Sequence, residues 1–341
     1  MEKLKVPEPY SCGLILSYYC NCECKQCMYF GSPNWSADWI SERDLKLTLE
    51  KLSKTIKHSP YGPEEVSLNH GLHFTGGEPF LRYDLLLKGV ELANEYKIPS
   101  TFVETNCYWC KNDEITTKRF KELKEKGLNG VLISVNPFML EYIPFEMTER
   151  AIRICNQLFE RNLMVYQAGY YTQFKNFEFK DTLPLDNYKR LVSLEDLKRS
   201  VEILQMGRAP YKLTDWYNKY PASYFFAESC APELVRNWHI HVDNYGNYMP
   251  GYCGGLSWGK IKDIDKLCNN GIDLEEKLIL KTLIFFGLED LYGLAASEFG
   301  YEELEGGYIS KCHLCFDIRK ELVKKTDRFK ELNPREFYFH L

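Results

Sequence analysis

The chain has 341 residues, a formal net charge of −5 and 45% hydrophobic residues. This length suits one large domain and a smaller one, and the acidic balance excludes the general electrostatic footprint of a nucleic-acid-binding protein. The 13 cysteines come without an N-terminal apolar signal stretch, so they favour a reducing cytoplasm over a secreted disulfide framework. No apolar run approaches the roughly eighteen residues that a membrane span needs.

The predicted elements alternate between strand and helix along the first two thirds of the chain. Apolar, strand-like segments lie near 12–18, 71–75, 100–105, 131–136, 163–169 and 203–207. Apolar helical faces separate most of them: Leu45, Leu49, Leu52 and Ile56 behind the candidate N-cap Ser41; Leu86, Val90 and Ala93; Ala151, Cys155 and Leu158; and Leu194, Leu197, Val201 and Leu204 behind Ser193. This alternation predicts an α/β fold with a parallel sheet and right-handed crossovers. An eight-unit barrel takes about 250 residues, so about 200 residues hold about six βα units.

Three cysteines near the N-terminus, Cys20, Cys24 and Cys27, have the spacing C-x3-C-x2-C. Three thiolates on one short loop can hold three irons of a [4Fe–4S] cluster and leave the fourth iron open to a small molecule. The alternatives are a zinc loop or thiols without a ligand. Zinc sites usually close with four ligands in two pairs, and no fourth ligand follows Cys27 closely. The spacing therefore favours an iron–sulfur reaction centre.

A second motif, Gly-Gly-Glu-Pro at 76–79, lies between the strand-like segment 71–75 and a helical stretch near 82–96. Paired glycines allow backbone conformations closed to other residues and a close approach to a ligand. The exposed groups of Gly76 and Gly77 could bind a zwitterion, and Glu78 could accept from an ammonium group. Alone, such a turn is more often structural. Together with the cysteine spacing it is highly specific.

At these residues the chain resembles the radical S-adenosylmethionine (SAM) superfamily. The resemblance implies a partial (β/α)6 TIM-like barrel whose cysteine loop follows the first strand. It implies that SAM chelates the open iron through its amino and carboxylate groups, while the Gly-Gly-Glu-Pro turn holds the methionine amine. One electron, from a reductant such as flavodoxin or ferredoxin, then cleaves SAM to methionine and a 5′-deoxyadenosyl radical. Such centres are oxygen-sensitive. In this family a bulky apolar residue usually precedes the third cysteine; here it is Gln26, so the adenine contact passes to Met28 or Tyr29.

Polar residues end the third and fourth predicted strands, where a barrel places its active site. The resemblance implies that Thr105, Asn106 and Ser134 contact the methionine carboxylate and the ribose of SAM; strand-end capping is the alternative. Arg208 follows the sixth predicted strand, in a sequence similar to a short motif of relatives with extra clusters. It could pair with a carboxylate, but satisfying helix-end carbonyls is the favoured interpretation.

The C-terminal third carries a second cysteine set: Cys230, Cys253, Cys312 and Cys315. Residues 238–247 alternate apolar and polar before a turn signal, so they predict a β-hairpin that brings Cys230 near Cys253. A helical stretch near 273–298 precedes the C-x2-C pair. The order resembles the SPASM/twitch domain of radical SAM enzymes and implies a second, auxiliary [4Fe–4S] cluster. The spacing from Gly246 to Cys253 is longer than usual, and further cysteines are missing after Cys315. A four-cysteine zinc site and unliganded thiols are the alternatives.

The sequence assigns no single role to some of the other cysteines or to two histidines of the predicted hairpin. Cys22 lies off the ligand spacing and is interpreted as a bystander. Cys107 and Cys110 follow Asn106 directly and could donate a hydrogen atom to a product radical, although packing is favoured. His239 and His241 share one hairpin face, where they could act as an acid–base pair or support a metal ligand.

The sequence thus predicts a cytoplasmic radical SAM enzyme. Its core domain covers 1–215, and a smaller α+β auxiliary-cluster domain covers 216–341. The enzyme would abstract hydrogen from a small molecule, or from a peptide delivered by a separate protein. Two other classes stay open: an iron–sulfur electron-transfer protein that does not cleave SAM, and a zinc-stabilised binding module.

Overall fold

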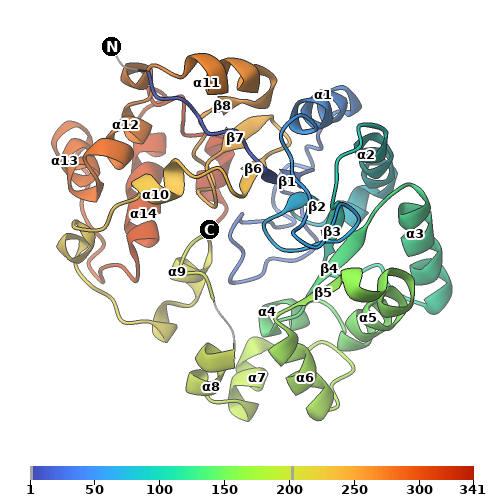
Figure 1. Ribbon diagram of the computed structural model, residues 1–341. Helices are drawn as coiled ribbons and strands as arrows, with labels where there is room; N and C mark the ends of the chain where they lie inside the picture. Colours follow the sequence, from blue (N-terminus) through green and yellow to red (C-terminus); the bar gives the residue numbers. More distant parts are fainter. Residues whose placement is uncertain (1–2, 201–202) are drawn as a thin grey trace. The chain divides into compact units, whose positions relative to one another are not determined.

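The computed structural model describes residues 3–200 and 203–341 (Figure 1). It divides into two compact units. The first, here the sheet unit, comprises Tyr10–Cys24 and Gly31–Ile203. The second, here the C-terminal unit, comprises Leu204–Leu341, the segment Lys25–Phe30 and the N-terminal residues as far as Pro9. The functional division at 215 and 216 stays a prediction.

Five parallel strands form the sheet unit, in the order β5-β4-β3-β2-β1. The strands are β1 (Ser11–Ile15), β2 (Gly71–Thr75), β3 (Phe102–Thr105), β4 (Gly130–Ser134) and β5 (Leu163–Tyr166). The α-helices are α1 (Glu42–Leu52), α2 (Tyr83–Glu95), α3 (Asp113–Glu125), α4 (Pro137–Leu140), α5 (Phe145–Phe159), α6 (Ala168–Asn176), α7 (Leu185–Leu191) and α8 (Leu194–Ser200), with 3-10 turns η1 (Pro79–Arg82) and η2 (Glu160–Asn162). The predicted α/β class and parallel sheet are confirmed.

Helices α1, α2, α3 and α5 lie along one side of these strands (Figure 1). The predicted start of α1 is confirmed: the Ser41 hydroxyl accepts from the backbone N–H of Asp44 at 3.1 Å. Leu45, Leu49 and Leu52 of this helix are buried. The inward residues of the strands, among them Leu14 and Phe74, are fully buried. The apolar residues that the periodicity identified therefore form the core of the sheet unit, and this core fixes the positions of the strand ends.

The sixth predicted strand, 203–207, is wrong: these residues form turns and bends. Gly207 has a left-handed backbone, with φ +61°, and the next N–H, that of Arg208, donates to the carbonyl of Cys27 at 3.0 Å. Backbone groups that bond to the cysteine loop cannot also pair in a sheet. The helix predicted behind Ser193 exists, with Ser193 accepting from Asp196 N–H at 3.1 Å, but Leu204 lies beyond its end and Val201 lies outside the described residues.

The C-terminal unit contains a small antiparallel sheet, β6-β7-β8, and six α-helices in its described part. Its strands are β6 (Ile240–Val242), β7 (Asn247–Met249) and β8 (Gly259–Lys260); its α-helices are α9 (Ala209–Lys212), α10 (Ala231–Leu234), α11 (Ile264–Asn270), α12 (Leu278–Phe285), α13 (Leu288–Phe299) and α14 (Lys311–Lys325). Its 3-10 turns are η3 (Thr214–Trp216), η4 (Ala222–Phe225), η5 (Ile261–Asp263), η6 (Leu274–Glu276) and η7 (Arg335–Phe339).

The predicted hairpin is confirmed, with Val242 opposite Tyr248 in the ladder of β6 and β7. The Asp243 carboxylate closes its turn by accepting from the backbone N–H groups of Tyr245 and Asn247, at 3.0 and 2.8 Å. The helical stretch predicted near 273–298 is interrupted at Gly287, whose φ of +101° separates α12 from α13. Across the described residues, no helix combines the length and the hydropathy that crossing a bilayer requires.

Candidate functional site

The first half of the cysteine loop follows β1 in the sheet unit and brings three thiols together. The Cys22 thiol is hydrogen-bonded to the thiols of Cys20 and Cys24, and the Cys22 N–H donates to the Cys20 sulfur at 3.4 Å. These hydrogen bonds, together with burial, hold the pKa of Cys22 well above its usual range. Cys22 therefore stays a neutral thiol, placed between two predicted iron ligands.

The second half of the loop, which carries Cys27, belongs to the C-terminal unit and is held by residues 207 and 208. A Cβ on Gly207 would lie 2.4 Å from the Cys27 carbonyl oxygen. The Arg208 guanidinium, fully buried, donates to the carbonyls of Phe30 at 2.8 Å and of His340 at 3.3 Å. Arg208 thus binds two backbone carbonyls: that of His340 follows the 3-10 turn η7, as the helix-end interpretation expects, whereas that of Phe30 lies just after the cysteine loop and at no helix end.

The Gly-Gly-Glu-Pro turn connects β2 to η1 and lies against the chain just before Cys20. The Gly77 N–H donates to the Ser17 carbonyl at 2.8 Å, and the Glu78 N–H donates to the Tyr19 carbonyl at 3.2 Å. A Cβ on Gly77 would come within 1.9 Å of that Tyr19 oxygen, and Gly76 has φ +135°. Close approach to the cysteine loop itself therefore requires glycine here, a reason that the sequence did not reveal.

The Glu78 carboxylate is buried, with 1% of the residue exposed. It accepts from the Phe80 N–H at 3.1 Å, the Thr105 hydroxyl at 3.0 Å and the Asn106 N–H at 2.7 Å. Burial raises the pKa of Glu78 to about 7, against the opposing effect of these hydrogen bonds. Glu78 can therefore hold or release a proton near neutral pH, and it can pair with a cation that enters the site.

Thr105 and Asn106, at the end of β3, contact Glu78, and Asn106 also contacts the thiols of Cys20 and Cys22. The Thr105 oxygen also accepts from the Cys107 N–H and the Trp109 indole N–H, both at 3.1 Å, so its hydrogen-bonding capacity is used. The Asn106 amide donates to Asn21 Oδ1 at 2.9 Å and approaches the sulfurs of Cys22 at 3.5 Å and Cys20 at 3.9 Å. Asn106 thus faces the cysteine loop.

Ser134 and Tyr29, two further predicted SAM contacts, are not among the hydrogen-bond partners of Glu78 described above. Ser134, at the end of β4, lines a small cavity with Asn136, Met139 and Phe145 among others. Tyr29 is buried, and its hydroxyl lies 3.2 Å from His241 Nε2, while His241 Nδ1 lies 3.1 Å from the Gly251 carbonyl oxygen. One His241 tautomer satisfies both contacts, with Nδ1–H donating to Gly251 and Nε2 accepting from Tyr29.

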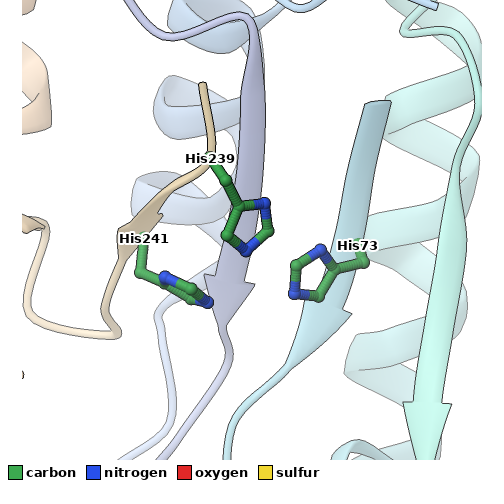
Figure 2. Close-up of side chains that lie close together, drawn as sticks. All are labelled: His73, His239 and His241. Atoms are coloured by element: carbon green, nitrogen blue, oxygen red, sulfur yellow. The ribbon is translucent and has the colours of Figure 1, made fainter. Parts of the chain in front are cut away.

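Three buried histidines are drawn in Figure 2. The rings of His239 and His241, both in the C-terminal unit, have centroids 4.8 Å apart and are nearly perpendicular, as expected for residues that share a hairpin face. His73 belongs to the sheet unit, on β2, where its ring stacks on Phe102. Burial lowers the pKa of His73 to about 3, so its contact with Glu104, 3.5 Å from Nε2, involves a neutral imidazole at neutral pH.

The second cysteine set converges within the C-terminal unit. Cys230 precedes α10, Cys253 follows β7, and Cys312 and Cys315 lie in the first turns of α14. Burial is the largest cause that raises the pKa of Cys230, Cys253 and Cys312, to about 11 for Cys253 and about 12 for Cys312, and neighbouring cysteines of the set add to each increase. These three thiols are protonated without a metal, and a metal that binds them displaces protons.

Both cysteine sets suit an iron–sulfur cluster by the chemistry of their donors. Sulfur is the donor that such clusters use, and in the first set the Cys22 N–H and the Asn106 amide already point at sulfur. Around the second set, buried guanidinium nitrogens lack a hydrogen-bond partner among the described residues: Arg319 Nε and two nitrogens of Arg236. Donors of this kind suit the sulfur atoms of a cluster.

Cys107, Cys110 and Cys155 form a separate group of fully buried thiols. The Cys107 thiol is hydrogen-bonded to that of Cys110, and burial raises the pKa values of Cys107 and Cys155 well above the usual range. The neighbouring Trp109 stacks on Phe80, with centroids 4.1 Å apart. These contacts favour the packing interpretation, because buried neutral thiols are inert.

Comparison with known proteins returned only distant structural similarity. No family model matches the chain, and no curated protein matches it. Polyhistidine-tagged anSMEcpe with bound AdoMet is 14% identical, with a TM-score of 0.45 over 96% of this chain and 99% of that one. BtrN in complex with AdoMet and 2-DOIA is 15% identical, with a TM-score of 0.41 over 85% and 91%. Streptococcus suis SuiB bound to precursor peptide SuiA is 12% identical, with a TM-score of 0.33 over 97% and 76%. Similarity of this extent establishes no function.

Proposed function

We propose that this protein is a radical SAM enzyme. The proposal is supported above all by one juxtaposition: the Gly-Gly-Glu-Pro turn is hydrogen-bonded to the backbone that leads into Cys20. A buried carboxylate and a set of sulfur donors therefore meet at the carboxyl ends of β1, β2 and β3, the edge where parallel α/β folds bind their ligands.

Cys20, Cys24 and Cys27 are the proposed ligands of three irons. When bound, the cluster would supply the electron that cleaves SAM to methionine and a 5′-deoxyadenosyl radical, which abstracts hydrogen from substrate. The chain's own residues prepare this site. Cys22, as a neutral thiol, and the Asn106 amide donate toward the ligand sulfurs, and such hydrogen bonds tune a cluster's potential.

Glu78 is the proposed partner of the SAM ammonium group. Thr105 and the backbone N–H groups of Phe80 and Asn106 fix the carboxylate orientation, so the group is in place before a ligand arrives. Gly76 and Gly77 bring the turn against the loop without a side chain between them. Ser134 and Tyr29 remain the proposed contacts for the ribose and the adenine.

Cys230, Cys253, Cys312 and Cys315 are the proposed ligands of an auxiliary [4Fe–4S] cluster. Four cysteines leave that cluster no open iron, so its proposed role is to accept or relay an electron from a substrate radical. The proposed substrate is a small molecule or a peptide, and the proposed location is the cytoplasm, where a low-potential flavodoxin or ferredoxin would supply electrons.

Anaerobic purification followed by iron and sulfide analysis tests the proposal. We expect about eight irons per chain, four for each cluster, and release of 5′-deoxyadenosine when SAM and dithionite are added. The triple variant Cys20→Ala, Cys24→Ala, Cys27→Ala should hold about four irons and release none. Cys268→Ala, which changes a cysteine outside both sets, should behave like the natural chain.

Two results would contradict the proposal and favour a different function. Bound zinc in place of iron would indicate a zinc-stabilised binding module. Iron with no cleavage of SAM under strong reduction would indicate an electron-transfer protein.

A further inference from the structure

Arg319 lies four residues after Cys315 on α14, and therefore on the same face of the helix. Its side chain is hydrogen-bonded to Cys315. Nη1 also donates to the Gly254 carbonyl at 3.1 Å and to the Tyr338 hydroxyl at 2.9 Å. The guanidinium thus connects the helix that carries two of the four cysteines with the loop that carries Cys253.

The loop after Cys253 is shaped around this side chain and its neighbours. A Cβ on Gly254 would lie 2.4 Å from the ring of Phe337, and Gly255 has φ +73° with Tyr338 Oη 2.9 Å from the position of its missing Cβ. The Tyr338 hydroxyl donates to the Gly255 carbonyl at 2.5 Å. Arg319 and Tyr338 therefore bind the two consecutive carbonyls, of Gly254 and Gly255, that follow Cys253.

The charge of Arg319 needs a partner, because a guanidinium stays protonated and only 5% of the residue is exposed. Among the described residues, no carboxylate comes within ion-pair distance of it. A buried cation without an anion costs several kcal/mol in general. Tyr338, Cys315 and Cys253 act on Arg319 electrostatically. Burial raises the pKa of Tyr338, whose hydroxyl keeps its proton and donates it to Gly255, so the groups that could supply negative charge are the sulfurs of Cys315 and Cys253. They become thiolates when a metal binds.

We propose that Arg319 is a positioning residue whose charge raises the reduction potential of the auxiliary centre. The inference rests on the proposed auxiliary cluster. Four thiolates give such a centre a net negative charge, and reduction adds one more electron. A fixed cation in a low-dielectric site favours the more negative state. Arg319 Nε is buried and has no hydrogen-bond partner among the described residues, so the guanidinium keeps a donor available for a bound cluster.

The test uses the Cys20→Ala, Cys24→Ala, Cys27→Ala background, in which only the auxiliary site loads. The midpoint potential is measured by a redox titration followed by electron paramagnetic resonance. Arg319→Gln should lower the reduced-to-oxidised ratio at a given potential about tenfold, which is about 59 mV for one electron. Arg319→Lys should stay within about threefold of the parent. The control Arg328→Gln removes an exposed arginine that pairs with Glu298, and it should leave the potential unchanged.

Three outcomes would overturn the inference. A loaded Arg319→Gln centre with the parent potential would show that the charge does not act on it. A Lys variant shifted as far as the Gln variant would show that geometry matters and charge does not; this comparison of Lys with the parent also decides the matter if Arg319→Gln does not fold. A parent without iron would end the proposed auxiliary function and the inference together, before any variant is compared.

Discussion

At the scale of single residues, burial and hydrogen bonding act on Glu78 in opposite directions. Burial is the larger effect and raises its pKa from 4.5 to about 7. Between these two values the folded protein binds more protons than the unfolded chain at this position. The free energy of unfolding therefore decreases as pH rises through this window. This difference in pKa between the folded and the unfolded chain corresponds to roughly 3 kcal/mol of unfolding free energy.

Replacing Glu78 by Gln removes this titration. In the metal-free protein, we expect the unfolding free energy of the natural chain to lose about 3 kcal/mol more between pH 4.5 and pH 8 than that of Glu78→Gln. Urea titrations at several pH values measure the difference. Parallel pH profiles for the two proteins would contradict the assignment.

The affinity for SAM should depend on the same carboxyl group, but it should increase with pH where the unfolding free energy decreases. If Glu78 binds the SAM ammonium group, ionised Glu78 is the competent form. The affinity for SAM should then increase as pH rises through about 7, and Glu78→Gln should lose this dependence together with at least about tenfold in affinity. Glu331→Gln is the matched control, because Glu331 is a second buried carboxyl with a raised pKa. An equal loss of SAM affinity in Glu78→Gln and Glu331→Gln would contradict the role of Glu78 as the partner of the ammonium group.

At the scale of elements, the segment after α8 shows why a strand-like pattern does not always form a strand. Residues 203–207 contain apolar residues, but Gly207 packs against Cys27 and Met28, and the Arg208 N–H donates to the Cys27 carbonyl. The left-handed Gly207 permits this contact, since any side chain would collide with Cys27 and Met28. The end of the predicted sixth strand therefore holds a predicted iron ligand and does not pair in the sheet.

Two glycine variants separate this contact from simple backbone strain. Gly207→Ala and Gly246→Ala both place a side chain at positive φ, which costs about 1 kcal/mol in either case. Only Gly207 meets backbone atoms within 3 Å, whereas the nearest atom at Gly246 is 3.7 Å away. We expect Gly207→Ala to lose about half of its iron, from the first site, and Gly246→Ala to keep all of it. Equal iron contents in the two variants would contradict the inference that the contact of Gly207 with Cys27 holds the first iron site.

At the scale of the whole molecule, Cys20 and Cys24 belong to the sheet unit, whereas Cys27 and all four cysteines of the second set belong to the C-terminal unit. The division falls between Cys24 and Lys25, so the first loop belongs to both units by sequence. The auxiliary set lies in the C-terminal unit alone. Burial raises the pKa values of Cys230, Cys253 and Cys312, so a metal must compete with protons for these three thiols.

This competition predicts a pH-dependent stabilisation by metal. The gain in melting temperature of the iron-loaded over the metal-free protein should increase from pH 6.5 to pH 8, because the protons that the metal displaces are released more favourably into a solution of lower proton activity. Anaerobic thermal unfolding at both pH values measures it. In Cys312→Ala, Cys315→Ala the part of this increase that comes from the auxiliary site should disappear. A gain that does not change with pH would exclude thiolate ligation there.

Local sequence determined much of this protein by itself. The apolar periodicity predicted six strands, of which five form the parallel sheet; the Ser41 cap predicted the start of α1, and the turn signal predicted the hairpin. The cysteine spacings and the Gly-Gly-Glu-Pro turn identified the candidate ligands. These features depend on residues close together in the chain, where side-chain pattern and backbone preference act directly.

The tertiary structure alone decided the rest. The raised pKa of Glu78, the hydrogen bond from Arg208 to the cysteine loop and the burial of Arg319 against Gly254 and Tyr338 all involve segments distant in sequence. Desolvation and hydrogen bonding depend on what surrounds a group in space, and a linear pattern does not carry that information.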